Sequence, residues 1–571
     1  TSFGVDFNSY SRSYYRPSTL PTSLDRLPPS VPEGSKRDKN MLNWVWENTL
    51  SYTTIIKDVH NLSAIAGWTA QKESVNTSLL AGNGYPNDLV HTMNAASAIT
   101  SWSATAYEWS LLSALARVQY SYKGKYLLSA AARMDGSSRF GKNNRWGMFP
   151  SASAGWYISE EDFMKDIKWL TSLKLRASYG ISGNFNIGNY EYYATLSEDN
   201  YVFGKADGTL ASGLRPATAG NPDLGWEKTA MFNLGLEIGL FNMLTLELDL
   251  YNSNTTDMLL NVPVAEFSGF STVPMNIGKV NNKGVEFAIS TTNTWGDFTW
   301  NNRFNISANR NEVKDLGGVD EMITTSESVT FITKVGEPIG NYYTLVTDGV
   351  FANQAEIDNS KNPDKSQRKY AYVSGAKPGD FRFKDMDGNM EIDENDRTIT
   401  GNYMPKFTYG FSTELKYKWF DLSIALQGVQ GNKIANIFRR YIDNMEGGNN
   451  CQVDALDRWQ SESNPGSGYV VRANRSATGM NGTTSTWHIE DGSYMRIKNI
   501  TFGYTLPKSL LTNVGISRAR VYFSTQNPFT FTKYSGYNPE VNMKGGSLTP
   551  GIDYGTYPLS KSFVFGLNVT F

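Results

Sequence analysis

Apolar and polar residues alternate one by one along many short segments of this chain. The clearest segment is LTLELDLY, residues 244–251. Its leucines at 244, 246, 248 and 250 alternate with the polar residues Thr245, Glu247 and Asp249. The segments FTWNNRFNISAN, residues 298–309, and SFVFGLNVTF, residues 562–571, repeat the alternation. A period of two places successive side chains on opposite faces of a β-strand. The pattern therefore predicts an all-β protein whose strands have one apolar and one polar face.

The alternating segments predict sixteen strands joined by connections that are long and short in turn. The strands are expected near residues 1–10, 41–56, 60–75, 109–122, 125–134, 148–157, 172–183, 228–239, 243–252, 283–292, 298–310, 404–416, 419–429, 494–505, 518–527 and 561–571. The long connections are 11–40, 76–108, 135–147, 184–227, 253–282, 311–403, 430–493 and 528–560. This layout is typical of a transmembrane, antiparallel, up-and-down β-barrel with long loops at one end and short turns at the other.

Two further features favour a membrane barrel over a soluble sandwich. Trp156, Trp169, Trp295 and Trp419 all lie at or beside the predicted short turns, where an interfacial aromatic girdle is expected. Charged residues also recur on the polar face within the strands, and both signs of charge suit a wide, water-filled or plugged lumen. These are Arg117, Arg133, Lys174, Arg176, Glu237, Glu247, Glu286, Arg303 and Glu414.

Composition excludes several other classes of protein. The 571 residues contain no apolar run of about 18, which excludes a helical membrane protein. The net charge of −2, from 53 basic and 55 acidic residues, gives no support for nucleic-acid binding. Cys451 is the single cysteine, so no intrachain disulfide can form. The chain opens on TSFGVDF without Met or a signal peptide, and we expect residues upstream of Thr1 to be missing.

Several long stretches resemble the SusC/RagA family of TonB-dependent outer-membrane transporters. They appear in the family's order and run from about residue 110 to the end of the chain. They are RMDGSSRFGKNNRWGMFPSASAGWYISEEDFMK (133–165), WLTSLKLRASYGISGN (169–184), VGEPIGNYYTLVTDGVF (335–351), residues 379–401, PKFTYGFSTELKYKWFDLSIALQGVQGN (405–432), SYMRIKNITFGYTLPK (493–508) and the final SFVFGLNVTF.

The resemblance implies a barrel of about 22 strands in the bacterial outer membrane, with its lumen filled by an N-terminal plug. Residues 1–571 would then be the C-terminal part of that barrel, with the plug and the first strands absent from this chain. The short turns would face the periplasm and the long loops the outside. The implied function is import of an oligosaccharide or an oligopeptide, with no enzymatic activity. The implied partners are a SusD-like lipoprotein lid, the TonB complex acting through the missing N-terminal part, and a second transporter–lid pair.

The segment DMDGNMEIDEND, residues 385–396, has the spacing of an EF-hand-like Ca²⁺ loop. Hard carboxylate and carbonyl oxygens at this spacing can surround Ca²⁺. Met390 stands where the sharp-turn glycine is expected, and position 12 is aspartate rather than glutamate. A solvated acidic loop is the alternative, and no cofactor is otherwise required. The candidate ligands are Asp385, Asp387, Asn389, Glu391, Asp393 and Asp396.

The sequence gives little evidence for any other metal or ligand site. His60, His91 and His488 are scattered and have no partner cysteines, which argues against a zinc or iron site. Aromatic residues gather in the long connections and near the strand ends, where flat rings beside polar groups suit sugars and suit peptides nearly as well. The set does not single out any one residue as a ligand contact. Its members are Tyr190, Tyr192, Tyr193, Tyr201, Trp226, Tyr342, Tyr343, Tyr370, Tyr372, Tyr403, Trp459, Trp487, Tyr534, Tyr537, Tyr554 and Tyr557.

Two alternatives from other classes remain open at the level of sequence. A passive porin could be complete with sixteen strands if residues 1–10 paired with residues 561–571. A soluble, surface-attached all-β binding protein is the second alternative, and it would need no detergent for purification.

Overall fold

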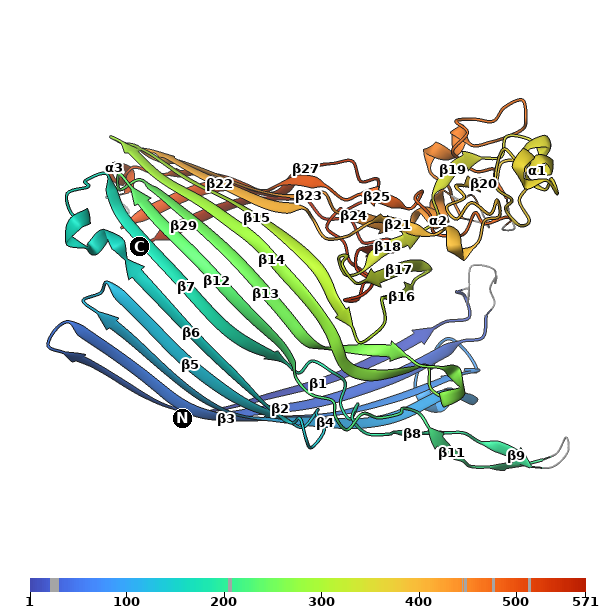
Figure 1. The fold of residues 1–571 in the computed structure, drawn as a ribbon, viewed down its shortest axis with the longest axis horizontal. Helices are drawn as coiled ribbons and strands as arrows, with labels where there is room; N and C mark the ends of the chain where they lie inside the picture. Colours follow the sequence, from blue (N-terminus) through green and yellow to red (C-terminus); the bar gives the residue numbers. More distant parts are fainter. Residues whose placement is uncertain (21–29, 204–207, 444, 446–448, 475–477, 512–514) are drawn as a thin grey trace. The chain divides into compact units, whose positions relative to one another are not determined.

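A computed structural model describes residues 1–571 except 21–29, 204–207, 444, 446–448, 475–477 and 512–514. Its main feature is a sixteen-stranded sheet in which the strands follow one another in chain order (Figure 1). The strands are β1 (Ser2–Arg16), β2 (Glu33–Ile56), β3 (His60–Asn83), β4 (Ala98–Tyr122), β5 (Tyr126–Ser137), β6 (Trp146–Tyr157), β7 (Leu170–Asn184), β12 (Glu227–Leu240), β13 (Leu244–Pro263), β14 (Thr272–Trp295), β15 (Phe298–Leu316), β22 (Phe407–Tyr417), β23 (Phe420–Gln430), β26 (Tyr494–Thr505), β27 (Arg518–Thr532) and β29 (Ser562–Thr570). Each overlaps one of the sixteen predicted strands, so the predicted meander is confirmed.

Several strands are longer than predicted. β2, β3 and β4 contain 24, 24 and 25 residues and continue into the predicted loops 11–40 and 76–108. The prediction was wrong here because it ended each strand where the apolar alternation stops. Backbone pairing continues beyond that point, as far as Glu33 opposite Asn83, through the polar run EGSKRDKN. A strand needs a hydrogen-bonded neighbour, but it does not need an apolar face.

The shortest connections are tight turns. Lys123 and Gly124, between β4 and β5, both have positive φ, at 51° and 69°. Phe241 and Asn242, between β12 and β13, have φ of 54° and 57°. Two successive left-handed residues give the turn a twist that matches that of the paired strands. The four tryptophans predicted for this end lie at the strand ends or in the turns, as expected.

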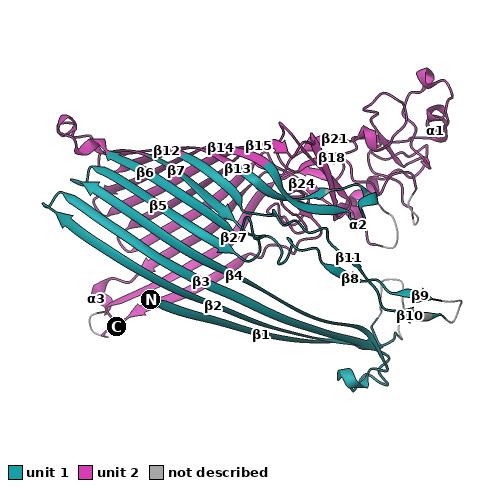
Figure 2. Cartoon of the chain, turned by 60° about the horizontal axis from the view of Figure 1, so that its bottom comes forward, with its two compact units in different colours: residues 1–156, 177–232, 255–278 teal, residues 157–176, 233–254, 279–571 magenta. Residues whose placement is uncertain are grey.

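Clustering of contacts divides the chain into two units (Figure 2). Unit 1 contains residues 1–156, 177–232 and 255–278, and unit 2 contains residues 157–176, 233–254 and 279–571. In unit 1, Phe140, Phe149 and Trp226 form a buried aromatic cluster. Unit 2 contains the other buried clusters discussed below.

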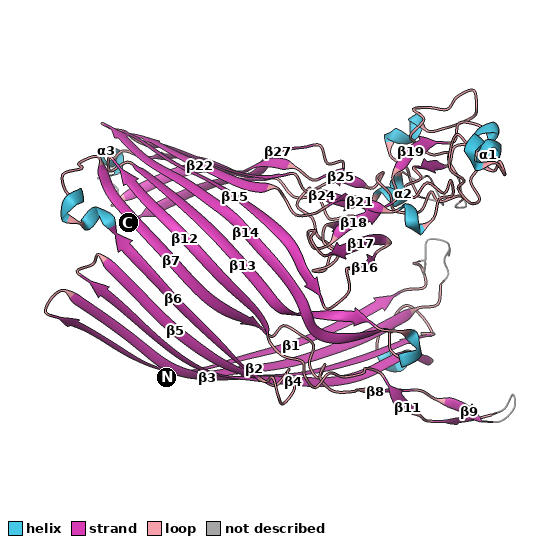
Figure 3. Cartoon of the chain, viewed as in Figure 1, coloured by secondary structure: helices cyan, strands magenta, loops and turns pink. Residues whose placement is uncertain are grey.

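The connections carry small sheets and short helices of their own (Figure 3), with η2, η3 and α3 in two of the shorter ones. The additional strands are β8 (Leu196–Glu198), β9 (Tyr201–Phe203), β10 (Thr209–Ala211), β11 (Leu214–Pro216), β16 (Glu321–Ser326), β17 (Val329–Lys334), β18 (Asn341–Thr344), β19 (Thr347–Val350), β20 (Phe381–Phe383), β21 (Thr398–Gly401), β24 (Lys433–Asn436), β25 (Ile489–Asp491) and β28 (Ile552–Asp553). The helices are α1 (Gln354–Ser360), α2 (Arg439–Ile442) and α3 (Lys508–Leu511), with 3₁₀ turns η1 (Met93–Ala95), η2 (Ile158–Glu160), η3 (Asp162–Met164), η4 (Glu266–Ser268), η5 (Lys365–Gln367), η6 (Glu394–Asp396) and η7 (Val453–Asp457). Among the described helices, none has the length and apolar content to cross a membrane.

The two faces of the strands differ as the alternation predicts. On β13, Leu248 and Leu250 are exposed, at 37% and 46% of their surface. On the opposite face, Asp249 accepts a hydrogen bond from Arg176 at 2.6 Å. Arg176 and Lys174 also approach Glu237, each at 3.2 Å. The sheet therefore exposes apolar side chains on one face and ties charged side chains together on the other.

Replacing Leu248 with arginine should destabilise the protein by about 2–4 kcal/mol, the cost of a cation on the lipid face of a membrane strand. A urea titration of the full-length protein in lipid vesicles measures this loss. Thr245→Arg, on the opposite face of the same strand, is the matched control and should cost less than about 1 kcal/mol. Equal losses for the two variants would contradict the assignment of the faces.

Candidate substrate-binding surface and acidic loop

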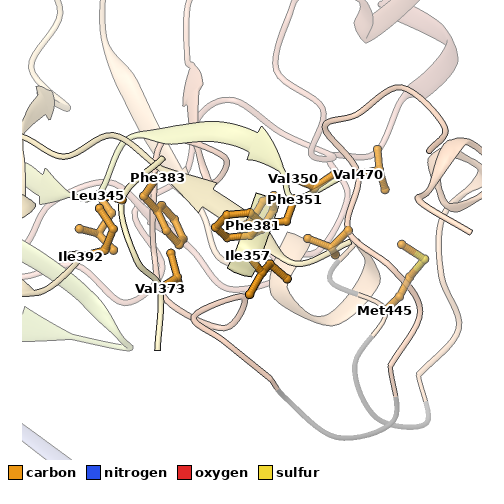
Figure 4. Packing of buried hydrophobic residues seen from close by; sticks show 12 residues of the cluster. Leu345, Val350, Phe351, Ile357, Val373, Phe381, Phe383, Ile392, Met445 and Val470 are labelled. Carbon is orange, nitrogen blue, oxygen red and sulfur yellow. The ribbon is translucent and has the colours of Figure 1, made fainter. Parts of the chain in front are cut away.

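Three of the long connections in unit 2 fold into one packed body. We call it the loop body: the described residues of 317–406, 431–493 and 533–561. Its largest buried cluster joins Phe351, Phe381 and Phe383 from the first connection to Val471 from the second (Figure 4). A second cluster packs residues of all three connections against one another, with Phe331, Ala435 and Ile552 among them. The connections therefore form a small folded unit with cores of its own.

Buried polar side chains tie the connections of the loop body together. The hydroxyl of Tyr342, on β18, donates to the backbone oxygen of Gly551 at 2.9 Å, and the backbone oxygens of Lys433 and Pro550 lie at 3.2 and 3.3 Å as alternative acceptors. Burial raises the pKa of Tyr342, so the phenol remains a donor at any physiological pH. β24 pairs with β25 in antiparallel and with β28 in parallel orientation, which adds backbone hydrogen bonds between the second and third connections.

The acidic loop, residues 385–396, brings together three of its six predicted ligands. Oxygen atoms of Asp385, Asp387 and Asp396 lie within 4.8 Å of one another. Met390 has a φ of 63°, so it adopts the left-handed conformation that the glycine position of such a loop requires. The backbone is therefore shaped as the motif predicts, although the residue at the turn is not glycine.

The side chains of the other three candidate residues make further contacts, while the ligand atom expected from Glu391 is its backbone carbonyl. Glu391 forms an ion pair with Lys365 at 2.9 Å. Asp393 caps the 3₁₀ turn η6 by accepting from the backbone N–H of Asn395 at 2.7 Å. Asn389 donates to Asp387 and accepts from the N–H of Glu391.

The clustered carboxylates are also hydrogen-bonded within the loop. Asp385 accepts from the N–H groups of Gly388 and Met390, and Asp396 accepts from those of Met386 and Asp393. Burial acts to raise the pKa of Asp385, but these backbone donors outweigh it and lower the pKa overall. Calcium binding by this loop stays a prediction.

If the loop holds Ca²⁺, the ion at 100 times its dissociation constant should stabilise the protein by about 2.7 kcal/mol. Thermal unfolding with Ca²⁺ and with Mg²⁺ measures this gain. Asp387→Asn should abolish most of it, because one clustered carboxylate loses its charge. Glu394→Gln, in the same loop but outside the cluster, is the control and should keep it. No gain for the unaltered protein would reject the calcium hypothesis in favour of a solvated loop.

The aromatic residues of the long connections include buried, partly buried and exposed side chains. Trp226, Tyr342 and Tyr534 are buried and serve packing. Others are exposed and free to meet a ligand, and these include Tyr190, Tyr193, Tyr201, Tyr537 and Tyr557. His488 is also buried, and burial lowers its pKa to about 3, so its imidazole is neutral at physiological pH.

A pocket of about 440 Å³ lies in the loop body between α2, η7 and the third connection. Its volume falls within the usual range for small-ligand sites. Its lining includes Asn436, Phe438, Cys451, Asp454, Ser535 and Tyr537. We call it the Asp454 pocket.

Of the residues just named, only Tyr537 belongs to the aromatic set marked in the sequence. The others carry no motif, because residues about 85–100 positions apart come together only when the connections fold. The candidate pocket could not have been found from spacing along the chain.

Comparison with known proteins identifies the class to which this sheet and these loops belong. Residues 1–528 match the family model described as "TonB dependent receptor-like, beta-barrel". The chain belongs to the TonB-dependent receptors, a family of transporters with a β-barrel fold. Within that family it is SusC/RagA-like, as the sequence motifs predicted.

Two relatives and one solved structure support this placement. The chain is 34% identical over 587 residues to TonB-dependent receptor P3 of Formosa agariphila, covering 100% of this chain and 56% of the relative. It is 33% identical over 484 residues to TonB-dependent receptor SusC of Bacteroides thetaiotaomicron, covering 82% and 44%. The structure of the RagAB peptide transporter matches with a TM-score of 0.81 and 27% identity, covering 100% of this chain and 59% of that one. The chain thus spans about half the length of the curated relatives it matches.

Proposed function

We propose that this chain forms the C-terminal part of the barrel of a TonB-driven importer in the bacterial outer membrane. The observation that carries the proposal is the family match over residues 1–528. The separation of the sheet into an apolar and a charged face supports it, because lipid requires the first and an aqueous path the second. The N-terminal plug, and the segment through which TonB acts, would lie outside this chain. The chain itself would carry out no covalent chemistry.

The cargo is proposed to be an oligomeric nutrient. The family resemblance favours an oligosaccharide. The similarity to a structure described as a peptide transporter supports an oligopeptide as the second candidate. Exposed aromatic rings in the long connections suit either class of cargo.

A SusD-like lipoprotein is proposed as the partner that covers the long connections, and two such pairs are proposed to associate. The connection between β7 and β12 supports a protein partner, because its strands β8–β11 form a ribbon of exposed apolar side chains. Exposed apolar groups in a cluster mark interaction surfaces. The ribbon contains Leu196, Tyr201, Val202, Phe203, Leu210 and Leu214, each at least half exposed.

Deleting the full gene in its host and measuring uptake of labelled oligosaccharides and oligopeptides tests the proposal. Uptake of one class should be lost, and it should also be lost when TonB is absent or the proton-motive force is collapsed. Uptake that survives collapse of the proton-motive force would support a passive porin instead. A protein that purifies from the soluble fraction without detergent would support the soluble alternative.

The lipoprotein partner can be tested separately. Replacing Leu196 and Leu214 of the ribbon with asparagine should reduce co-purification of the lipoprotein and leave barrel folding unchanged. Thr245→Asn, on the sheet, serves as the matched control.

A further inference from the structure

The Asp454 pocket combines apolar walls with an excess of negative charge. The rings of Phe438 and Tyr537 face it with centroids 6.5 Å apart. Asp454 lines the pocket and has no hydrogen-bond or ion-pair partner in the described part of the chain. An exposed carboxylate beside two aromatic faces favours a ligand that is itself partly apolar and positively charged.

Arg439, the residue after the lining residue Phe438, is already neutralised. The guanidinium of Arg439, on α2, donates from Nε to Asp443 and from Nη1 to the backbone oxygen of Trp487, both at 2.6 Å. It also lies 3.6 Å from Glu490 and stacks over the Trp487 ring at 4.1 Å. Arg439 therefore faces two carboxylates, and Asp454 adds a third. Arg440, the next residue of α2, donates to Ser328.

One buried oxygen atom of the pocket lining lacks a donor. Asn436 is 2% exposed; its Nδ2 donates to Glu490 and Ser535, but its Oδ1 accepts no hydrogen bond from the described residues. Asp443, one residue after the lining residue Ile442, is 6% exposed, and its Oδ1 is also without a donor in the structure as described. Buried polar atoms are normally paired, so the unpaired acceptor of Asn436 at the pocket indicates a ligand that supplies donors.

The negative charges around Asp443 also favour a positively charged ligand. Burial raises the pKa of its carboxyl, and the charges of Asp454 and Glu490 raise it further, while Arg439 acts in the opposite direction. Three carboxylates thus repel one another around one paired guanidinium. An incoming cation would relieve that repulsion.

We infer that the Asp454 pocket binds the ammonium or guanidinium group of an oligopeptide cargo. The inference rests on the proposed importer function and narrows its substrate class to peptides with a basic group. The cation pairs with Asp454, and the aliphatic stem beside it packs against Phe438 and Tyr537. A neutral oligosaccharide would leave the charge of Asp454 without a partner.

Cys451 makes the test direct, because the single cysteine of the chain is exposed and lines the pocket. The rate at which an uncharged maleimide modifies Cys451 in the purified full-length protein reports whether the pocket is occupied. A Cys451→Ser variant sets the background. The pentapeptide Ala-Lys-Ala-Lys-Ala should slow the reaction in a saturable manner. Ala-Glu-Ala-Glu-Ala and maltopentaose should not.

A charge-removing variant completes the test. Asp454→Asn should weaken protection by the basic pentapeptide about tenfold, the loss expected for one charge-assisted hydrogen bond. Asp457→Asn, three residues further in η7 and outside the pocket lining, removes the same charge and should leave protection unchanged. Equal weakening by both variants, equal protection by maltopentaose, or no protection by the basic peptide would each overturn the inference.

Failure of this inference can be told apart from failure of the proposed function. The protection assay uses purified protein and requires neither TonB nor a membrane potential, whereas uptake by cells requires both. Loss of TonB-dependent uptake on gene deletion, together with no protection of Cys451, would keep the importer and reject the pocket. Protection without TonB-dependent uptake would keep the pocket and reject the importer.

Discussion

Replacing Asp380 with asparagine should destabilise the loop body by about 3–5 kcal/mol, the usual cost of breaking a buried ion pair from one side. Asp380 is fully buried and accepts from Arg472 at 2.9 Å, Asn481 at 3.0 Å and Thr478 at 2.8 Å. The variant would leave the Arg472 guanidinium without a counter-charge. It would also replace a carboxylate oxygen, which accepts hydrogen bonds, with an amide N–H₂, which is itself a donor and cannot accept them.

Hydrogen exchange of the full-length protein measures this effect, because the loop body can open locally while the strands remain paired. Protection should fall around Asp380 and Arg472 and remain unchanged in β13. Asp348→Asn is the matched control: its half-exposed carboxylate lies 3.6 Å from Arg382, and such pairs contribute about 1 kcal/mol or less. Loss of protection of the same size in both variants would contradict a special role for Asp380.

Replacing Arg496 with alanine should release the third connection at a similar cost, about 3–5 kcal/mol, because three hydrogen bonds from one buried guanidinium are lost together. Arg496, on β26, is 1% exposed and donates to Thr530 at 2.9 Å, Glu540 at 2.5 Å and Asn538 at 2.7 Å. Arg496→Lys should recover only part of the loss, because an ammonium group cannot reproduce the planar fork that meets three acceptors.

Limited proteolysis of residues 533–561 measures the effect of Arg496. The alanine variant should be cut in this connection much faster than the unaltered protein, and the lysine variant at an intermediate rate. Arg518→Ala removes an exposed arginine at the start of β27 and should not change the rate. Equal rates for all three variants would show that Arg496 does not hold the connection.

The strands could be predicted from the sequence because a two-sided environment imposes a period of two. Each residue of LTLELDLY faces either an apolar or an aqueous medium. The alternation of apolar and polar residues therefore marks the position of the strand in the sequence. The pattern is missing from the polar run EGSKRDKN at the start of β2, which was therefore predicted as a loop although its backbone is paired with β3 throughout.

Cation binding by the acidic loop stays a prediction. The spacing in the sequence named six candidate ligands, and the carboxylates of three of them, Asp385, Asp387 and Asp396, lie within 4.8 Å of one another. The Asp454 pocket could not be predicted. Asn436 and Tyr537 lie in two separate connections that pack on one another, and no local pattern encodes that packing.

The shared cores of the loop body limit how its parts could be exchanged between relatives. Grafting one connection from another receptor would separate Asp380 from Arg472, or Tyr342 from Gly551. Buried polar groups would then lack hydrogen-bond partners. A chimera that transfers 317–406, 431–493 and 533–561 as a set would keep each partnership intact. Under the proposed function, a variant built for another cargo is therefore expected to fold only when the three connections are exchanged together.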